Sequence, residues 1–165
     1  MNPIDAILME LSHESATTRR LLEIVPAQHL AWKPHVKSMT MGRLATHIAE
    51  IPGWVSTILD KDGFDVATST YTPQTASSVA ELLAMFDKNV PMAEAAIRQQ
   101  TLDRLSTIWR ITKQGKVMLE MPRMGVIRTL LLNHLIHHRG QLSVYLRLKD
   151  VPLPSIYGPT ADTPM

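Results

Sequence analysis

The sequence has 165 residues and no cysteine. This absence excludes disulfide bonds, thiolate metal ligands and a cysteine nucleophile from the chain itself. A protein without disulfides suits a reducing compartment, and we expect a cytoplasmic protein. In line with that expectation, residues 1–14, MNPIDAILMELSHE, carry early acids and lack the basic and apolar regions of a secretory signal peptide.

Aromatic residues, long apolar runs and excess charge are also scarce. Aromatic residues make up 5% of the chain, and 17 basic against 15 acidic residues give a formal net charge of +2. No apolar run approaches the ~20 residues that a membrane-spanning helix requires. No cluster of lysine and arginine is interleaved with aromatic residues, as a nucleic-acid surface would need. We therefore expect neither a membrane nor a nucleic acid as a partner.

The composition and the apolar periodicity predict one helical domain over residues 1–165. A chain of this length that is 45% hydrophobic can bury a sizeable core. Residues 60–77 lack periodicity and suit a long crossover, and residues 105–121 read as a short two-stranded hairpin. Apolar residues recur at helical spacing over 3–23, 41–59, 79–97 and 123–149. We predict an all-α fold, a four-helix bundle with a long crossover between helices 2 and 3 and a small β-hairpin between helices 3 and 4.

The stretch Leu131–Tyr145, LLNHLIHHRGQLSVY, contains three of the seven histidines. His134 and His138 stand four apart, so a helix places both imidazoles on one face, where together they can hold one metal ion. At about 100° per residue, one stripe is expected to face the bundle interior. Its members are Ile127, Leu130, Leu131, His134, His138, Gln141, Tyr145 and Leu148. A third ligand must come from another helix: His47 lies on the core side of the second helix, and His13 on the first is its rival.

The residues alone leave other interpretations open. Core-facing histidines often form hydrogen bonds to neighbours instead of binding metal. His137 lies off the line of the pair, Gln141 could orient a histidine or face solvent, and Gly140 suits close packing or room for a ligand. Arg139 points away from the predicted stripe and suits an ion pair or a subunit contact.

Two well-known metal sites are not supported by the sequence. The segment Glu10–His13 fits Glu-x-x-His, but a di-iron site needs that motif twice, and no acid lies between Glu120 and Asp150. The pair of histidines also lacks the inner glutamate of zinc proteases, because Leu135 occupies that position.

Several segments together resemble the DinB family, a group of DinB/YfiT-like metalloenzymes. They are LATHIAE (44–50), IPGW (51–54), NHLIHHRGQLSVYLRL (133–148) and the tail VPLPSIYGPTAD (151–162). The resemblance implies a four-helix bundle, a homodimer and a divalent metal, often nickel or zinc, held by His47, His134 and His138. Related bundles include transferases that use low-molecular-weight thiols such as bacillithiol or mycothiol, and a maleylpyruvate isomerase.

Two functions of different class follow. The first is a metal-dependent enzyme acting on a small molecule, with thiol S-transfer as the leading reaction and hydrolysis second. Since the chain has no cysteine, the thiol would come from outside. The alternative is a non-catalytic, metal-binding or stress-related dimeric bundle protein. Apolar residues off the predicted stripe favour a dimer contact: Leu132, Leu135, Ile136 and Leu146.

Overall fold

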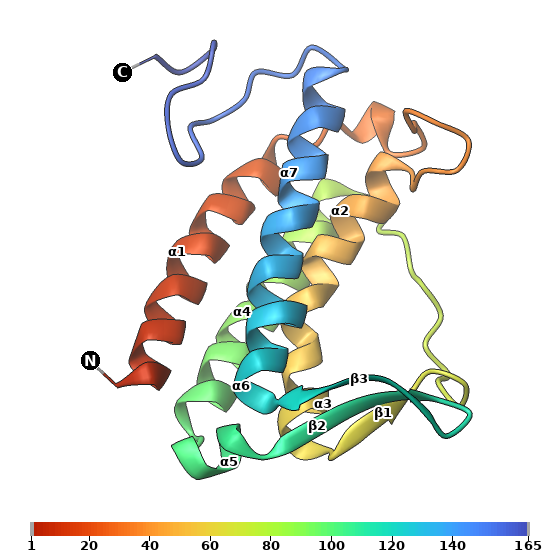
Figure 1. Cartoon of the computed structure of the whole chain (residues 1–165). Coiled ribbons are helices and arrows are strands. Elements are labelled where there is room, and N and C mark those ends of the chain that lie inside the picture. The colour runs from red at the N-terminus through yellow and green to blue at the C-terminus, as the bar shows by residue number, and fades with distance from the viewer. Residues whose placement is uncertain (1, 165) are drawn as a thin grey trace.

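The computed structural model describes residues 2–164 and is mostly helical, with one small sheet (Figure 1). The helices are α1 (Pro3–Glu23), α2 (Met41–Glu50), α3 (Val55–Asp60), α4 (Val79–Arg98), α5 (Leu102–Ser106), α6 (Arg123–Val126) and α7 (His134–Arg147). The long helices begin where the sequence supplies caps, because side-chain oxygens of Asn2, Thr40 and Ser78 accept hydrogen bonds from first-turn N–H groups. Each of the four predicted helical segments is found at about its predicted bounds, but two of them are divided. Residues 41–59 form α2, a 3₁₀ turn and α3, and residues 123–149 form α6, a π-helical stretch and α7. The sequence does not predict the short helix α5.

Helices α2 and α3 form one bent rod. They are joined by a tight 3₁₀ turn, Ile51–Trp54, which contains Pro52. Proline has no N–H to donate and cannot continue the α-helical ladder, which accounts for the bend at this point. The rod continues past the turn, so its buried side includes both Leu44 and Val55.

The long helices lie side by side around one apolar core. Helix α1 contacts α4 and α7, and α2 contacts the same two helices from the other side. Residues 66–77 return along these helices, so that α4 runs in the same direction as α2 (Figure 1). Fully buried side chains come from every long helix, among them Leu11, Leu44, Leu82 and Leu142.

The sheet has three strands, one more than the sequence predicts. Strands β2 (Ile108–Lys113) and β3 (Lys116–Pro122) form the expected antiparallel hairpin, and β1 (Gly63–Asp65) pairs parallel to β2. Strand β1 lies within the predicted crossover and has three residues, too few to give an alternating pattern. A Cβ atom at Gly63 would lie 2.9 Å from the Arg110 carbonyl oxygen, so this close pairing depends on glycine. The all-α prediction is thus corrected to a helical fold with a small sheet.

Arg123 joins the sheet to the end of α3. Its guanidinium is 1% exposed and donates hydrogen bonds to the carbonyl oxygens of Ile58 (3.0 Å) and Lys61 (2.9 Å). It also pairs with the Asp62 carboxylate at 2.6 Å and holds the pKa of that carboxyl below its ordinary value. These contacts give the buried guanidinium hydrogen-bond partners. Arg123 follows β3 directly, so it fixes the sheet against the C-terminal end of α3.

The last helical segment turns a different face inward from the one the wheel predicts. Between α6 and α7 the chain forms a π-helical stretch, Ile127–Asn133. A π turn takes more residues than an α turn, so it rotates the following face relative to a regular helix. The buried residues are Ile127, Leu131, Leu132, Leu135, Arg139, Leu142 and Leu146, while Gln141 and Leu148 are exposed.

This rotation overturns the sequence argument for a dimer contact. Leu132, Leu135 and Leu146 are 0% exposed within a single chain, and Ile136 is half-buried. Leu132, Leu135 and Leu146 belong to the core, so these three leave no apolar surface for a partner to cover. The homodimer stays a prediction, now without support from these residues.

Arg139, predicted to point away from the core, is also buried. It is 1% exposed, and its guanidinium lies 2.6 Å from the Glu14 carboxylate on α1. Tyr157 from the C-terminal tail completes the network: its hydroxyl donates to Glu14 at 2.8 Å and accepts from Arg139. The tail is thereby anchored across α1 and α7.

Close packing does not explain Gly140, because a Cβ atom there would have no neighbour within 4 Å. Among residues 2–164, none of the helices combines the length and hydropathy that a membrane crossing requires.

Candidate metal centre

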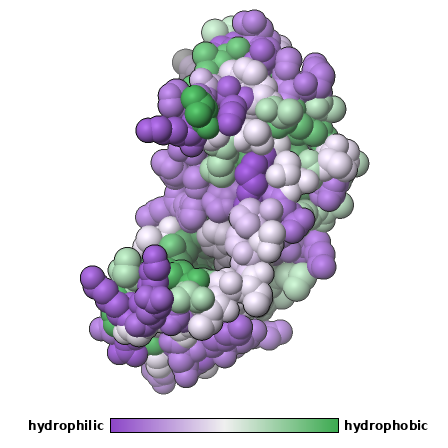
Figure 2. Space-filling view, turned by 90° about the vertical axis from the view of Figure 1, so that its right-hand side faces the viewer, coloured by the Kyte–Doolittle hydropathy of each residue, from purple (hydrophilic) through white to green (hydrophobic). Residues whose placement is uncertain are grey.

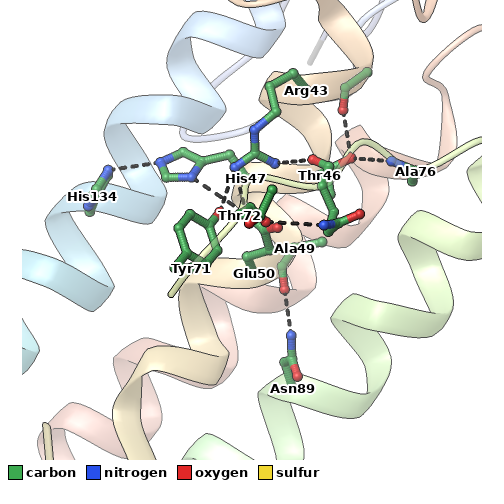
Figure 3. A network of polar contacts seen from close by, with 12 residues as sticks. Arg43, Thr46, His47, Ala49, Glu50, Tyr71, Thr72, Ala76, Asn89 and His134 are labelled. Carbon is green, nitrogen blue, oxygen red and sulfur yellow. Dashed lines mark hydrogen bonds and ion pairs between the residues drawn. The ribbon is translucent and has the colours of Figure 1, made fainter. Parts of the chain in front are cut away.

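Three histidines from two helices converge, and Figure 3 shows two of them, His47 and His134. His47 comes from α2, and His134 and His138 come from α7. One ring nitrogen of each lies within 4.8 Å of those of the other two, and the Nε2 atoms of His47 and His134 are 3.2 Å apart. These are the three histidines that the sequence singles out.

The π-helical stretch determines where the α7 pair lies. His134 is the first residue of α7, directly after Ile127–Asn133, and His138 follows one turn later. The sequence predicts both imidazoles in the interior, but they are half-buried, at the edge of the rotated core face. This correction places the cluster where one side can be reached from outside.

The histidines of the cluster are held neutral. Burial is the main reason that the pKa of His47 and of His134 falls to about 4. A proton on either ring would also be repelled by a protonated His138, and one on His47 by the Arg43 guanidinium. Burial also lowers the pKa of His138, against the opposing effect of its hydrogen bond to Gln141. At neutral pH the imidazoles therefore keep nitrogen lone pairs free for a cation.

Polar contacts on the far side of the rings orient two of the histidines, one through a hydrogen bond and one through a nearby carboxylate. His138 Nδ1 lies 2.6 Å from the Gln141 amide oxygen, which can only accept, so Nδ1 carries the proton and Nε2 keeps its lone pair. His47 Nδ1 faces the Glu50 carboxylate at 3.9 Å. Such outer contacts fix the tautomer and direction of metal-binding histidines.

Glu50 is itself held in place by two donors (Figure 3). Its carboxylate accepts hydrogen bonds from the Arg43 guanidinium and the Tyr71 hydroxyl, each at 2.7 Å. Arg43 lies one α2 turn before His47, whereas Tyr71 comes from the crossover. Tyr71 could not be found from the sequence, because its segment has no apolar periodicity. Only the folded crossover brings it next to α2.

This donor set fits a divalent metal ion. Two imidazole nitrogens bound tetrahedrally at 2.0–2.1 Å would be about 3.3 Å apart, close to the 3.2 Å separation here. Three protein ligands leave a coordination position for water or a substrate. Imidazole nitrogen suits zinc, nickel, copper and iron. Within residues 2–164, no other set of three histidines, aspartates or glutamates converges in this way.

The other residues considered as metal ligands lie outside the histidine cluster. His137 is exposed, and its ring packs against His138 with centroids 4.8 Å apart. His13 lines a groove with residues of α1 and α4, including Glu94 and Arg98, and takes no part in the cluster. Glu10 pairs with Arg128 across to the last helical segment. The single Glu-x-x-His match therefore contributes nothing to the site, as the sequence predicts.

Trp54 joins the cluster to the region beside the sheet. Its ring lies 5.4 Å from the His47 ring and 5.3 Å from the His134 ring, measured between centroids. It comes from the proline turn between α2 and α3, within the IPGW segment. The bend after His47 is what places this indole against two of the three histidines.

Known proteins share both the sequence pattern and the fold. The DinB family model matches residues 1–164. An uncharacterized protein of Bacillus subtilis (strain 168), YrdA, is 26% identical over 159 residues, which cover 96% of this chain and 90% of that protein.

Two solved structures share the fold at lower identity. A DinB-like protein from Bacillus cereus ATCC 10987 has a TM-score of 0.70 and 22% identity, covering 93% of this chain and 97% of its own. A DinB-like protein of Bacillus subtilis, YjoA, has a TM-score of 0.67 and 20% identity, covering 92% and 97%. With the family model matching nearly every residue, the chain belongs to the DinB family.

Proposed function

We propose that the protein is a metal-dependent enzyme whose helical body is a four-helix bundle carrying one divalent metal ion, nickel or zinc. The ligands would be His47, His134 and His138. The observation that carries the proposal is the convergence of three neutral imidazoles from two helices, with one ring nitrogen of each within 4.8 Å of the others.

A divalent ion held by three imidazoles lowers the pKa of a bound water or thiol and so supplies a nucleophile at neutral pH. The protein's own residues have positioning roles. Gln141 keeps the proton of His138 on Nδ1, and Glu50 faces His47 Nδ1 from the other side. Arg43 and Tyr71 in turn hold the Glu50 carboxylate still.

The proposed reaction is the transfer of an external thiol to an electrophilic substrate. The thiol sulfur forms a bond to the electrophilic carbon, the leaving group departs with its bonding electrons, and the thiol proton passes to water. The chain has no cysteine, so the sulfur must come from a low-molecular-weight thiol. Hydrolysis by a bound water is the second reaction that the same site could support.

Turnover with and without metal tests the proposal. The purified protein is incubated with a panel of thiols and aryl or alkyl halides, before and after treatment with a chelator, and product is followed by mass spectrometry. We expect a thioether product that disappears with the chelator and returns when nickel or zinc is added. Metal binding without any turnover would contradict the enzyme and favour the binding protein.

The homodimer is part of the same proposal and rests on the family resemblance. Light scattering at several protein concentrations tests it directly, and a mass of one chain throughout would contradict it.

A further inference from the structure

An apolar cavity of about 360 Å³ lies next to the histidine cluster. It opens between the bent α2–α3 rod, the last helical segment and the sheet, and Figure 2 shows a hollow with hydrophobic surface on this side of the molecule. Trp54 lines the cavity and also packs against His47 and His134. Trp54 thus contacts both the cavity and two of the proposed metal ligands.

The cavity gathers aromatic residues from a chain that has few. The sequence has three tryptophans, three tyrosines and two phenylalanines. Four of these eight line the cavity: Trp54, Phe64, Tyr71 and Trp109. They come from the proline turn, strand β1, the crossover and strand β2. Aromatic rings from four separate segments around one open space match the shape and polarity of a flat apolar ligand.

The lining also excludes charged ligands. Within the described residues 2–164, no charged side chain borders the cavity. The remaining lining residues are Thr57, Ile58, Ile111 and Leu130. The Tyr71 hydroxyl is already bonded to Glu50 and Arg43. A charged group placed here would lose its hydration without gaining a partner.

We propose that this cavity binds a planar aromatic group of the substrate on which the metal centre acts. The inference rests on the proposed function and adds the class of substrate, an electrophile with an aromatic substituent. An apolar cavity of about 150 Å³ holds benzene, so 360 Å³ has room for a two-ring system. A polar or charged thiol would approach the histidines from outside this cavity.

The tryptophans provide a test in the unmodified protein. Trp54 and Trp109 line the cavity, whereas Trp32 packs against Tyr145 and Lys149 away from it. The protein is labelled with ¹⁵N and titrated with 2-naphthol, a neutral two-ring aromatic. We expect the indole N–H signals of Trp54 and Trp109 to shift saturably while that of Trp32 stays in place. Absence of saturable shifts, or shifts centred on Trp32, would overturn the inference.

Cavity-filling variants give a second, independent test. Leu130→Trp from the helical segment and Ile111→Trp from the sheet each add bulk to the lining, and Val144→Trp adds it at an exposed site outside the cavity. We expect each filling variant to weaken 2-naphthol binding about tenfold or more, with the control unchanged, because a filled pocket cannot bury the ligand. Wild-type affinity in a folded filling variant would contradict the proposal. If neither variant folds, the tryptophan shifts in the wild type decide.

Separate measurements distinguish failure of the metal proposal from failure of the cavity proposal. His134→Ala should lose metal and still bind 2-naphthol, because the cavity lining is unchanged. A wild-type protein that carries metal but does not bind 2-naphthol would overturn the cavity assignment alone. If turnover is found, aromatic electrophiles should have higher kcat/KM than aliphatic ones of equal reactivity, and the filling variants should remove that preference.

Discussion

The Nε2 atoms of His47 and His134 lie 3.2 Å apart, although 87 residues separate the two histidines in the chain. Both rings are neutral at pH 7, so each nitrogen can offer a lone pair toward the same point. Two lone pairs so close repel one another unless a proton or a cation lies between them. A metal ion that also binds His138 satisfies all three rings at once.

Loss of the Gln141 contact should weaken metal binding. In Gln141→Ala the Nδ1 proton of His138 loses its acceptor, so the ring is free to rotate or change tautomer. Removing such an outer partner costs about 10–100-fold in metal affinity. Chelator competition with zinc measures it, with Gln99→Ala, an exposed glutamine at the end of α4, as the matched control. Equal affinity of both variants would argue against a positioning role for Gln141.

Acid should destabilise the metal-free protein through the same histidines. Burial lowers the pKa of His47 and His134 to about 4 in the fold, and exposed histidine titrates near 6.5. From pH 6.5 down to 4 the unfolded chain therefore binds more protons, and stability falls as pH falls. Allowing for partial exposure, we expect a loss of about 1 kcal/mol per histidine.

Urea unfolding at pH 7 and pH 4.5 measures this dependence. The variant His47→Gln, which cannot titrate, should lose correspondingly less stability than the wild type between the two pH values. The same loss in both proteins would place the acid sensitivity elsewhere in the molecule.

The buried pair Glu14–Arg139 should contribute strongly to stability. Both side chains are buried, and the carboxylate and guanidinium are 2.6 Å apart. Glu14→Gln leaves Arg139 without its counter-charge, and breaking a buried pair in this way costs about 3–5 kcal/mol. Arg110→Ala breaks an exposed pair with Glu120 on the sheet and should cost about 1 kcal/mol or less. Thermal unfolding compares the two, and equal losses would contradict the burial argument.

Replacing Gly140 or Gly63 with alanine should change the stability of the protein in opposite directions. At Gly140 a Cβ atom has open space in the middle of α7, so Gly140→Ala should stabilise the protein by about 0.5–1 kcal/mol. At Gly63 the same atom would lie 2.9 Å from the Arg110 carbonyl oxygen, and Gly63→Ala should separate β1 from β2. Urea unfolding measures both variants. Stabilisation by Gly63→Ala would show that β1 is not held as closely as described.

The sequence predicts this structure well where the signal is local. The long helices follow from apolar spacing and from caps such as Asn2 and Ser78, which act within a few residues. His134 and His138 can be named because they share a helix turn, whereas His47 is chosen over its rival His13 through the resemblance to the DinB family. Strand β1 escapes prediction because its partner β2 comes about 45 residues later and its three residues carry no pattern.

The wrong predictions about which residues of α7 are buried share one cause. A wheel of constant pitch cannot anticipate the π-helical stretch Ile127–Asn133, which rotates the face that follows it. Arg139 therefore looked exposed and Leu135 looked free for a partner, although both are buried. The partner of Arg139, Glu14, lies 125 residues away, so nothing near Arg139 in the sequence indicates a buried ion pair.

The metal content of the freshly purified protein tests the central claim most directly. Mass spectrometry of the elements, on protein prepared without chelator, should find about one nickel or zinc ion per chain. His47→Ala, His134→Ala and His138→Ala should each lose it, while His137→Ala, next to the cluster but outside it, should keep it. A wild-type protein without stoichiometric metal, or one whose metal survives removal of any of the three ligands, would contradict the account.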